Sequence, residues 1–519
     1  MAKHEAARIS ALNLTIVLAL CFGSLTYGYS FSVAATTLGQ APFYAYFGLT
    51  TDPTSDRYAF TNRIIGGLNG CYSAGGVIGS LLAGWSCDAL GRKKTLYLAT
   101  PIGVVGGAFQ GGAAHLAMLL LGRALTGISV GILMVLIPMF QCEISPPAQR
   151  GFLVSQHGVI LVLGYALAGW IGFGCSYTTN AAFQWRFPLC VQALWPLIMF
   201  LLIPFIPESP RWLLMQDRRD SAWEVINLLH NTDKDSDSHH ISFAREEFYQ
   251  MSHQVSADLQ ISRNETLSTL FTKPSYRKRM FCAFMTMFAT ESTGILVIYN
   301  YSVILYTGLG LSNKISLLLA AVFVTIACIG NGVNALLIDH FGRKILLVAG
   351  IAGSLITLIV EAAMTARYSG TDNKAGLKTG VVFLFLYIAC YASTLDATSY
   401  VFCTEIFPTH LRARGMAWSL AILFLCTIAY LIPAPTAFAQ VGWKYYLLFI
   451  VLSTINLPLI WYFFPETRGL ALEEVGEIFG DKIEVRLTHL TAEQREALDK
   501  DIEAEKETVE LEHVDQVAK

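Results

Sequence analysis

Long apolar runs recur along the whole chain and are separated by shorter polar segments. A helix needs about 20 predominantly apolar residues to cross the hydrocarbon core of a membrane. Twelve runs of this kind begin near Leu12, Arg63, Thr95, Ala117, Phe152, Phe187, Met280, Ser312, Ile345, Thr379, Met416 and Tyr445. The pattern therefore predicts an all-α membrane protein with twelve transmembrane helices.

A long polar segment divides these runs into two groups of six. It extends from Pro207 to Arg279, between the sixth and the seventh run. Another charged segment follows the last run, and its sequence LTAEQREALDKDIEAEKETVELEHV is typical of a solvated helix, with a loose polar tail without a specific partner as the alternative. We therefore expect an N-terminal bundle at residues 1–206, a cytoplasmic central loop at 207–279, a C-terminal bundle at 280–464 and a cytoplasmic tail at 465–519.

The composition agrees with a membrane protein. Hydrophobic residues make up 54% of the 519 residues and charged residues only 14%, whereas about a quarter of an average soluble protein is charged. The first apolar run is too long for a signal peptide and lacks a clear cleavage site, so we interpret it as the first span. The 11 cysteines are scattered without metal-type spacing, which favours packing roles over a disulfide framework.

Lysine and arginine are concentrated in one set of the predicted loops. The loops on the cytoplasmic side of a membrane protein carry an excess of these residues. The enriched set comprises the central segment and the turns that contain Arg92, Lys93, Lys94, Arg150, Arg343, Lys344, Arg412 and Arg414. We therefore expect both termini in the cytoplasm and the plasma membrane as the location. The sequon at Asn264 would then lie on the wrong side for glycosylation.

Three pairs of motifs repeat between the two groups of runs. They are Asp-x-x-Gly-Arg-Lys at Asp88 and Asp339, QCEISPPAQRG at 141–151 with CTEIFPTHLRARG at 403–415, and PESPRWLL at 207–214 with PETRGLALEEV at 465–475. The two members of each pair lie about 250 to 260 residues apart. This near-constant offset indicates that the chain consists of two related halves.

Together with GRALTGISVG at 122–131, these motifs resemble those of the sugar porter family of the major facilitator superfamily, in particular its fungal-type members. The resemblance extends from the first predicted span to about residue 480. It implies a fold of two six-helix bundles. It also implies a central solute site that opens alternately to each side of the membrane.

Charged residues of the repeated motifs lie where the predicted helices meet the cytoplasm. Opposite charges at such positions can join the bundles while the inner side is closed and must separate when it opens. We expect this cytoplasmic gate to contain Asp88, Arg92, Glu143, Arg150, Asp339, Arg343, Glu405 and Arg414. The simpler alternative is that these charges only anchor helix ends and set the topology.

Arg123 is unusual because it lies inside the fourth apolar run, where a charged residue is a candidate functional group. In proton-coupled members of the resembled family an acid on the first helix accompanies this arginine, and the matching residue here is Ser30. The loss favours facilitated diffusion, unless another group has taken over. The candidates for proton coupling are Arg123, Glu291, Asp396 and His157, although the two acids could be locally hydrogen-bonded and the histidine a packing residue.

A hydroxylated solute needs amide groups as hydrogen-bond partners and aromatic faces against its C–H surface. Gln156 corresponds to a glutamine of the family's fifth helix, with helix–helix hydrogen bonding as the alternative role. The second half departs from the family, because its Gln-Gln-x-x-Gly-x-Asn pattern appears here as Thr290, Glu291, Gly294 and Leu296 and its expected tryptophan as Tyr400. We expect the solute-binding set to be Gln156, Thr290, Glu291, Asn300, Tyr301, Asp396 and Tyr400.

These features predict a secondary transporter of a sugar, polyol or related small hydroxylated solute. The lost amides and added acids also allow a carrier of a specialised metabolite or organic acid, and a non-transporting nutrient sensor is a third alternative. No phosphate loop, zinc-protease motif or nucleophile elbow occurs in the sequence, so we expect no enzyme and no ATP-driven pump. The expected partners are the solute and the lipid bilayer, without a cofactor, a metal or nucleic acid, and the oligomeric state is left open.

Overall fold

The computed structural model describes residues 11–52, 54–146, 149–230, 238–262, 269–308, 312–368, 374–470 and 474–481. The predictions for the sequon at Asn264 and for the tail beyond Asp481 fall outside these ranges. Within them the regular structure is helical, without a strand. The helices are α1 (Ala11–Leu38), α2 (Ala41–Phe47), α3 (Tyr58–Leu90), α4 (Arg92–Gly111), α5 (Leu116–Ile144), α6 (Arg150–Cys175), α7 (Ala181–Val191), α8 (Leu194–Leu202), η2 (Ile203–Phe205), α9 (Pro210–Met215), α10 (Arg219–His230), α11 (Ser238–Ser262), α12 (Thr269–Thr272), α13 (Pro274–Glu291), α14 (Ile295–Asn300), α15 (Ser302–Gly308), α16 (Asn313–Phe341), α17 (Arg343–Tyr368), α18 (Lys374–Thr394), α19 (Asp396–Glu405), α20 (Arg412–Leu431), α21 (Ala434–Val441), η3 (Gly442–Lys444), α22 (Tyr445–Phe463) and α23 (Val475–Ile478).

Ten helical segments of the described chain are long and apolar enough to cross a membrane. Two further helices, α3 with 33 residues and α4 with 20, pack beside them and complete the predicted twelve. The hydropathy of α3 is lowered by glycines, which allow close contact with α5. A Cβ on Gly75 would lie only 2.3 Å from the carbonyl oxygen of Ala124, and one on Gly127 only 2.0 Å from that of Tyr72.

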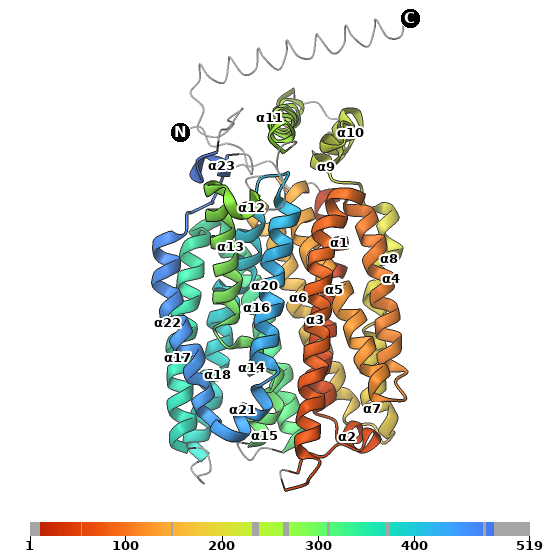
Figure 1. The fold of residues 1–519 in the computed structure, drawn as a ribbon, viewed down its shortest axis with the longest axis vertical. Coiled ribbons are helices and arrows are strands. Elements are labelled where there is room, and N and C mark those ends of the chain that lie inside the picture. Colours follow the sequence, from red (N-terminus) through yellow and green to blue (C-terminus); the bar gives the residue numbers. More distant parts are fainter. Residues whose placement is uncertain are drawn as a thin grey trace, which may run out of the picture.

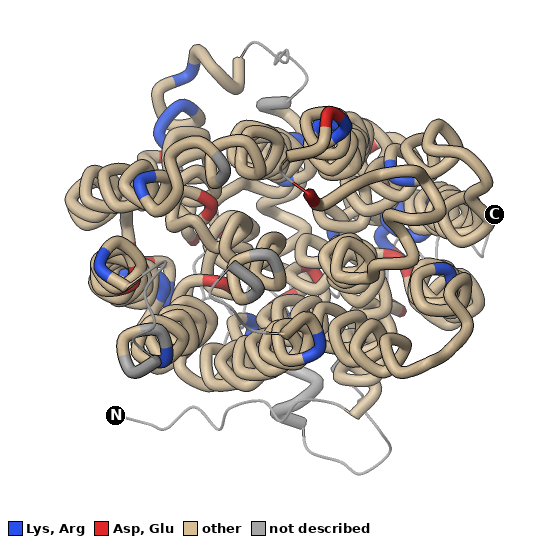
Figure 2. Tube along the Cα trace, turned by 90° about the horizontal axis from the view of Figure 1, so that it is seen from below, with Lys and Arg blue, Asp and Glu red and all other residues tan. Residues whose placement is uncertain are grey.

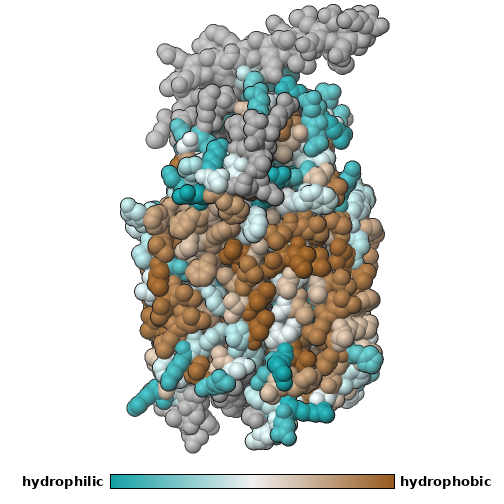
Figure 3. All heavy atoms as spheres, viewed as in Figure 1, coloured by the Kyte–Doolittle hydropathy of each residue, from teal (hydrophilic) through white to brown (hydrophobic). Residues whose placement is uncertain are grey.

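The two halves of the chain form two bundles that lie side by side. In Figure 1 helices α1 to α8 occupy one side of the molecule and α13 to α22 the other. The interface between the bundles includes the contacts of α6 with α16 and of α3 with α20. Viewed along the bundles, the helices surround a central region (Figure 2). An apolar belt lies between two more polar ends (Figure 3), as expected for a protein embedded in lipid.

The two ends of the bundles differ. One end, which we call the cap end, carries α9, α10, α11 and α23, and the opposite end carries α2, so we call it the α2 end (Figure 1). The segment between the bundles, predicted only as a polar loop, contains helices that pack through the apolar side chains of Trp212, Leu213, Ile226, Met251 and Val255. The domain boundaries at residues 206, 279 and 464 stay predictions.

Three membrane-spanning segments of the second bundle are interrupted in the described chain, and two of them carry an acid at the break. Helix α13 ends at Glu291 and α14 begins at Ile295, with Gly294 between them at a φ of +89°. Helix α18 ends at Thr394 and α19 begins at Asp396. Interrupted helices place helix ends, with their unpaired backbone groups, inside the membrane. The two predicted acids of this bundle therefore lie at the interruptions.

Candidate functional site

The two bundles enclose a cavity of about 40 Å³. Helices α1 and α6 of the first bundle contribute to its wall, and the second bundle supplies the remainder. Aromatic rings form much of the lining: Tyr27, Tyr165, Tyr299, Phe323, Tyr391 and Tyr400. The rings of Tyr165 and Tyr299 stack across the bundle interface with their centroids 5.1 Å apart. Such flat, amphipathic side chains can contact both the C–H and the O–H groups of a small solute.

Two carboxyl groups, Glu291 and Asp396, complete the lining. Glu291 is 4% exposed, and its Oε2 atom has no hydrogen-bond partner among the described residues. Asp396 accepts a hydrogen bond at Oδ2 from Nδ2 of Asn331 at 2.8 Å. The described lining contains no lysine, arginine or histidine. The cavity therefore combines aromatic faces with two acids that lack a basic neighbour.

The structure brings three of the predicted solute-binding residues together, because Glu291, Asp396 and Tyr400 all line the cavity. The described lining does not include Gln156, whose amide donates to the carbonyl oxygen of Phe152 on its own helix at 3.1 Å. Thr290, Asn300 and Tyr301 are likewise buried outside this lining. The Nδ2 of Asn300 donates to the carbonyl of Leu296 at 3.0 Å. The binding roles of these residues stay predictions.

Four tyrosines of the cavity were not among the predicted site residues: Tyr27, Tyr165, Tyr299 and Tyr391. Each lies in an apolar run, where an aromatic residue usually belongs to the packed core. The sequence did contain a signal for these tyrosines. The helices expected around the centre are rich in aromatic residues, and the amides of the family are lost there. That combination would have indicated an aromatic pocket in place of an amide-rich one.

Contacts between the bundles close the cavity toward the α2 end. The hydroxyl of Tyr299 donates to the hydroxyl of Ser32 across the interface. Nearer the α2 end, Nδ2 of Asn313 donates to the carbonyl of Gly39 at 2.9 Å. Tyr301 takes part in the same closure: its hydroxyl donates to the carbonyl of Leu431 at 2.9 Å and accepts from Nδ2 of Asn69 at 3.5 Å.

A buried charge cluster lies at the cap end of the first bundle. Arg92 donates from Nε and Nη2 to Oε2 and Oε1 of Glu143 at 2.9 and 2.7 Å, and the hydroxyl of Ser209 donates to Oε2 of Glu143 at 2.6 Å. The carboxylate of Glu208 accepts from the backbone N–H of Arg92 at 3.0 Å, at the beginning of α4. Burial raises the pKa of the Glu208 carboxyl, while hydrogen bonds from backbone N–H groups act in the opposite direction. The motif PESPRWLL therefore holds the end of α4 against α5.

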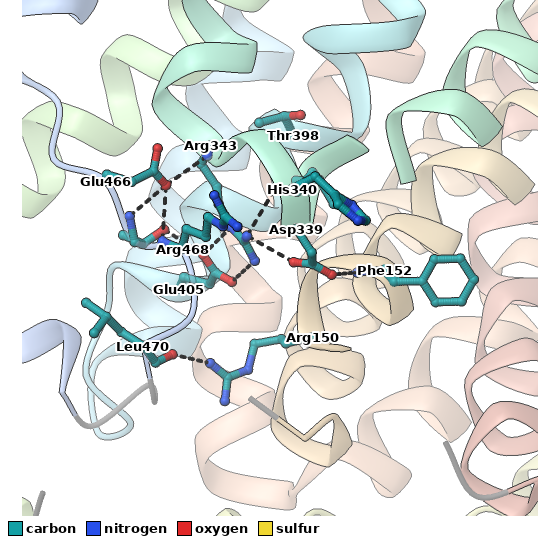
Figure 4. Close-up of polar contacts among 12 residues, drawn as sticks. Arg150, Phe152, Asp339, His340, Arg343, Thr398, Glu405, Glu466, Arg468 and Leu470 are labelled. Carbon is teal, nitrogen blue, oxygen red and sulfur yellow. Dashed lines mark hydrogen bonds and ion pairs between the residues drawn. The ribbon is translucent and has the colours of Figure 1, made fainter. Parts of the chain in front are cut away.

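The second bundle repeats this cluster at its own cap end (Figure 4). Arg343 donates from Nε and Nη2 to the two oxygens of Glu405 at 3.0 and 2.8 Å. The hydroxyl of Thr467 donates to Glu405 at 2.7 Å, as Ser209 does to Glu143 in the first bundle. Glu466 accepts from the backbone N–H of Arg343 at 2.8 Å. The sequence repeat is thus also a repeat of hydrogen-bond geometry.

Other contacts at the cap end join one bundle to the other. Nε of Arg414 lies 3.2 Å from Oδ2 of Asp88, and the backbone N–H of Phe152 donates to Oδ2 of Asp339 at 2.8 Å. Nη1 of Arg150 donates to the carbonyl of Leu470 at 3.2 Å (Figure 4).

The structure adds Arg412 to this group, since its Nη1 lies 3.7 Å from Oε1 of Glu143. Arg150 and Arg414 each precede the last glycine of the repeated motif, but α6 begins at Arg150 and α20 begins at Arg412. Arg412 is therefore the positional counterpart of Arg150. All eight predicted gate residues lie at the cap end, and their gating role stays a prediction.

Arg123 is buried without a carboxylate at ion-pair distance in the described part of the chain. Its Nη1 donates to the carbonyl oxygen of Ser30 at 2.7 Å, and its guanidinium lies 4.3 Å from the ring centroid of Tyr72. The position expected to carry an acid thus contacts Arg123 through its backbone. His157 does not line the cavity; its Nδ1 and the Ser24 hydroxyl hydrogen-bond at 2.7 Å.

Comparison with known sequences identifies relatives over most of the chain. The family described as Sugar (and other) transporter matches residues 16–479. The MFS-type transporter criB of Aspergillus cristatus is 31% identical over 455 residues, which cover 88% of this chain and 90% of that protein. The sugar transporter STL1 of Saccharomyces cerevisiae is 29% identical over 483 residues, which cover 91% of this chain and 82% of that protein.

The fold is similar to that of a solved bacterial transporter. The proton:xylose symporter XylE bound to 6-bromo-6-deoxy-D-glucose matches with a TM-score of 0.79 at 20% identity, over 91% of this chain and 100% of that chain. An inward-open form of XylE from E. coli gives a TM-score of 0.65 at 21% identity, over 90% of this chain and 99% of that chain. Together with the family match, these findings show that the chain belongs to the sugar transporter family of the major facilitator superfamily and is a multi-pass integral membrane protein with the fold of a secondary transporter.

Proposed function

We propose that this protein carries a sugar, polyol or closely related small hydroxylated compound across the plasma membrane by alternating access. The observation that carries the proposal is the cavity between the two bundles, lined by aromatic rings and two carboxyl groups. Aromatic faces cover the C–H surface of such a solute, while tyrosine hydroxyls and carboxyl oxygens bind its hydroxyl groups. The sugar transporter named among the relatives supports the same class of solute.

The charge of the cavity argues against an organic acid as the solute. An anionic solute would meet two carboxyl groups and no basic side chain in the described lining. Bringing like charges together in a site of low dielectric constant is unfavourable. Arg123 does not compensate, because it does not line this cavity. A neutral hydroxylated solute avoids this repulsion.

The cap end is the cytoplasmic end in this proposal. It carries the cation-rich turns around Arg92, Arg343 and Arg412, as the distribution of lysine and arginine in membrane proteins requires of the cytoplasmic side. The described chain begins at Ala11 and ends at Asp481 near this end (Figure 1), which supports cytoplasmic termini. The contacts of Arg412, Arg414 and Asp339 between the bundles would then form the cytoplasmic gate.

Initial uptake of labelled D-glucose, D-xylose and glycerol tests the proposal in cells that lack their own carriers for these compounds. We expect Tyr400→Ala to raise the half-saturation concentration of the transported compound about tenfold, because an aromatic contact worth about 1.4 kcal/mol is lost. Tyr97→Ala is the matched control, since Tyr97 lies on the outside of the first bundle against Phe200 and not in the cavity. An unchanged half-saturation concentration in Tyr400→Ala, or no uptake of any compound by protein shown to be at the surface, would contradict the proposal.

A further inference from the structure

We propose that Glu291 binds and releases a proton during each transport cycle, while Asp396 stays ionised, so that the solute moves together with a proton. The inference rests on the proposed function for the identity of the solute, and it assigns the coupling site to the second bundle. The position expected to carry an acid is Ser30, and this loss would otherwise indicate transport without a coupled proton.

The position of the two acids is the first observation. Glu291 and Asp396 belong to different interrupted helices and line the same small cavity. Two carboxylates that share a site rarely both carry a negative charge. With no basic side chain in the described lining, one of them must hold a proton while both ends of the cavity are closed.

The helix ends determine which acid holds the proton. Asp396 is the first residue of α19, where the positive end of the helix dipole favours a carboxylate, and it accepts a hydrogen bond from Asn331 at 2.8 Å. Glu291 is the last residue of α13, where the negative end of the dipole disfavours a carboxylate. Its Oε2 has no partner among the described residues. The proton is therefore assigned to Glu291.

The groups that face the two acids do not supply a positive charge. They come from α1, α6, α14, α18, α19 and α20, and the titratable ones are Tyr27, Tyr165, Tyr299, Tyr387, Tyr391, Tyr400, Cys426 and Tyr430. Two of them are occupied by other contacts: the hydroxyl of Tyr387 donates to the carbonyl of Thr293 at 3.0 Å, and that of Tyr430 bonds the hydroxyl of Ser292 at 2.8 Å. His157 lies behind Tyr400, with ring centroids 5.1 Å apart.

The coupling follows from the cost of closing the cavity. When the α2 end opens, water delivers a proton to the Glu291 carboxylate. The O–H bond that forms neutralises the carboxyl group. The cavity can then close around the solute, because a buried neutral acid costs much less free energy than a second buried carboxylate. When the cap end opens, the O–H bond breaks and water on that side accepts the proton.

Proteoliposomes test the coupling directly. With the membrane potential held at zero and an inward gradient of one pH unit, we expect the wild-type protein to accumulate the transported compound, among D-glucose, D-xylose and glycerol, up to about tenfold. Glu291→Gln keeps the shape of the protonated acid, so it should still exchange labelled for unlabelled compound but accumulate none. Glu361→Gln is the matched control, since Glu361 is 2% exposed in α17 of the same bundle but does not line the cavity.

Two further results would overturn the inference. One is proton-driven accumulation by Glu291→Gln equal to that of the wild type. The other is exchange of a labelled organic cation without proton movement, which would make the two acids a binding site for a positively charged solute.

Infrared spectroscopy of the purified protein provides a test that needs no solute. At neutral pH the wild-type protein should show a carbonyl band of a protonated carboxylic acid that Glu291→Gln loses. An identical band in the wild type and Glu291→Gln would show that Glu291 is ionised and would overturn the assignment. If no compound is exchanged but the band behaves as expected, the proposed solute class fails and the protonation of Glu291 stands.

Discussion

Arg92 and Arg343 each meet a buried glutamate through two hydrogen bonds, whereas Arg123 and Glu291 are buried without an ion-pair partner among the described residues. A buried pair with ideal geometry maintains structure, because removing one partner leaves the other charge uncompensated. A buried ionisable group without such a partner is costly to keep and therefore points to function. Arg414 represents a third kind of charged residue, because its side chain is 39% exposed and its contact with Asp88 crosses the bundle interface.

This distinction predicts different consequences for two substitutions at the cap end. Glu143→Gln should lower the stability of the protein by about 3–5 kcal/mol, because Arg92 remains buried without a counter-charge. Arg414→Ala removes a partly exposed ion pair, which contributes only about 0–1 kcal/mol. Thermal unfolding of both variants in the same detergent measures the difference. A melting temperature equally reduced in both would contradict this assignment of roles.

Residue types and spacing in the sequence were sufficient to find the charged positions of the cap end. Motifs such as Asp-x-x-Gly-Arg-Lys carry their chemistry within a few neighbouring residues, so the repeat of Asp88 and Asp339 could be recognised directly. The cavity could not be predicted in the same way, because its wall combines residues from seven separate helices. Gln156 illustrates the limit: its position in the helix matches the family, but its side chain bonds its own backbone and lies outside the described lining.

At the scale of elements, the interruptions of α13/α14 and α18/α19 place the two acids in the cavity. The sequence contains the cause of the α13/α14 interruption: Gly294 has a left-handed backbone conformation that other residues adopt only at a cost. A Cβ at this position would also lie 2.9 Å from the ring of Phe449 in α22. Both interruptions lie inside segments that are long and apolar enough to cross a membrane, so the pattern of apolar runs predicted two continuous spans.

Gly294→Ala should therefore destabilise the protein and displace Glu291. We expect a loss of about 1–2 kcal/mol from the backbone conformation, with a further loss from the contact with Phe449. Thermal unfolding measures the total in a background that carries Phe449→Ala and in one that does not. The cost of Gly294→Ala should be smaller in the Phe449→Ala background but still present. An alanine at 294 that is tolerated in both backgrounds would show that the left-handed turn is not required.

At the scale of the whole molecule, the duplication produced two bundles whose charge clusters match but whose contacts across the interface do not. Asp88 contacts the side chain of Arg414, while Asp339 contacts the backbone N–H of Phe152. The apolar runs predicted the twelve helices, and the sequence offset predicted the two halves. It could not predict how closely the bundles approach at each level, because that distance depends on small residues facing each other across the interface.

Gly158 of α6 and Ala397 of α19 are such a pair. A Cβ on Gly158 would lie 2.8 Å from the Cβ of Ala397 and 3.1 Å from its Cα. Alanine at 158 favours the helix itself by about 1 kcal/mol, so Gly158→Ala should fold normally. The added methyl group meets an obstacle only when the bundles close, and we therefore expect the variant to populate the state that is open at the cap end.

Cys142 is a native reporter for this change. Its thiol is buried in an apolar cluster made by both bundles, with Val154, Ile338, Leu346 and Val401. In a variant that retains Cys142 as its only cysteine, Gly158→Ala should increase the rate of maleimide labelling several-fold and slow transport. Gly158→Ala with Ala397→Gly should restore slow labelling in part, because the nearest obstacle is then the Cα of residue 397. Labelling that stays slow in Gly158→Ala would mean that the bundles separate elsewhere, and that closure at the cap end depends on its charged contacts rather than on this close approach.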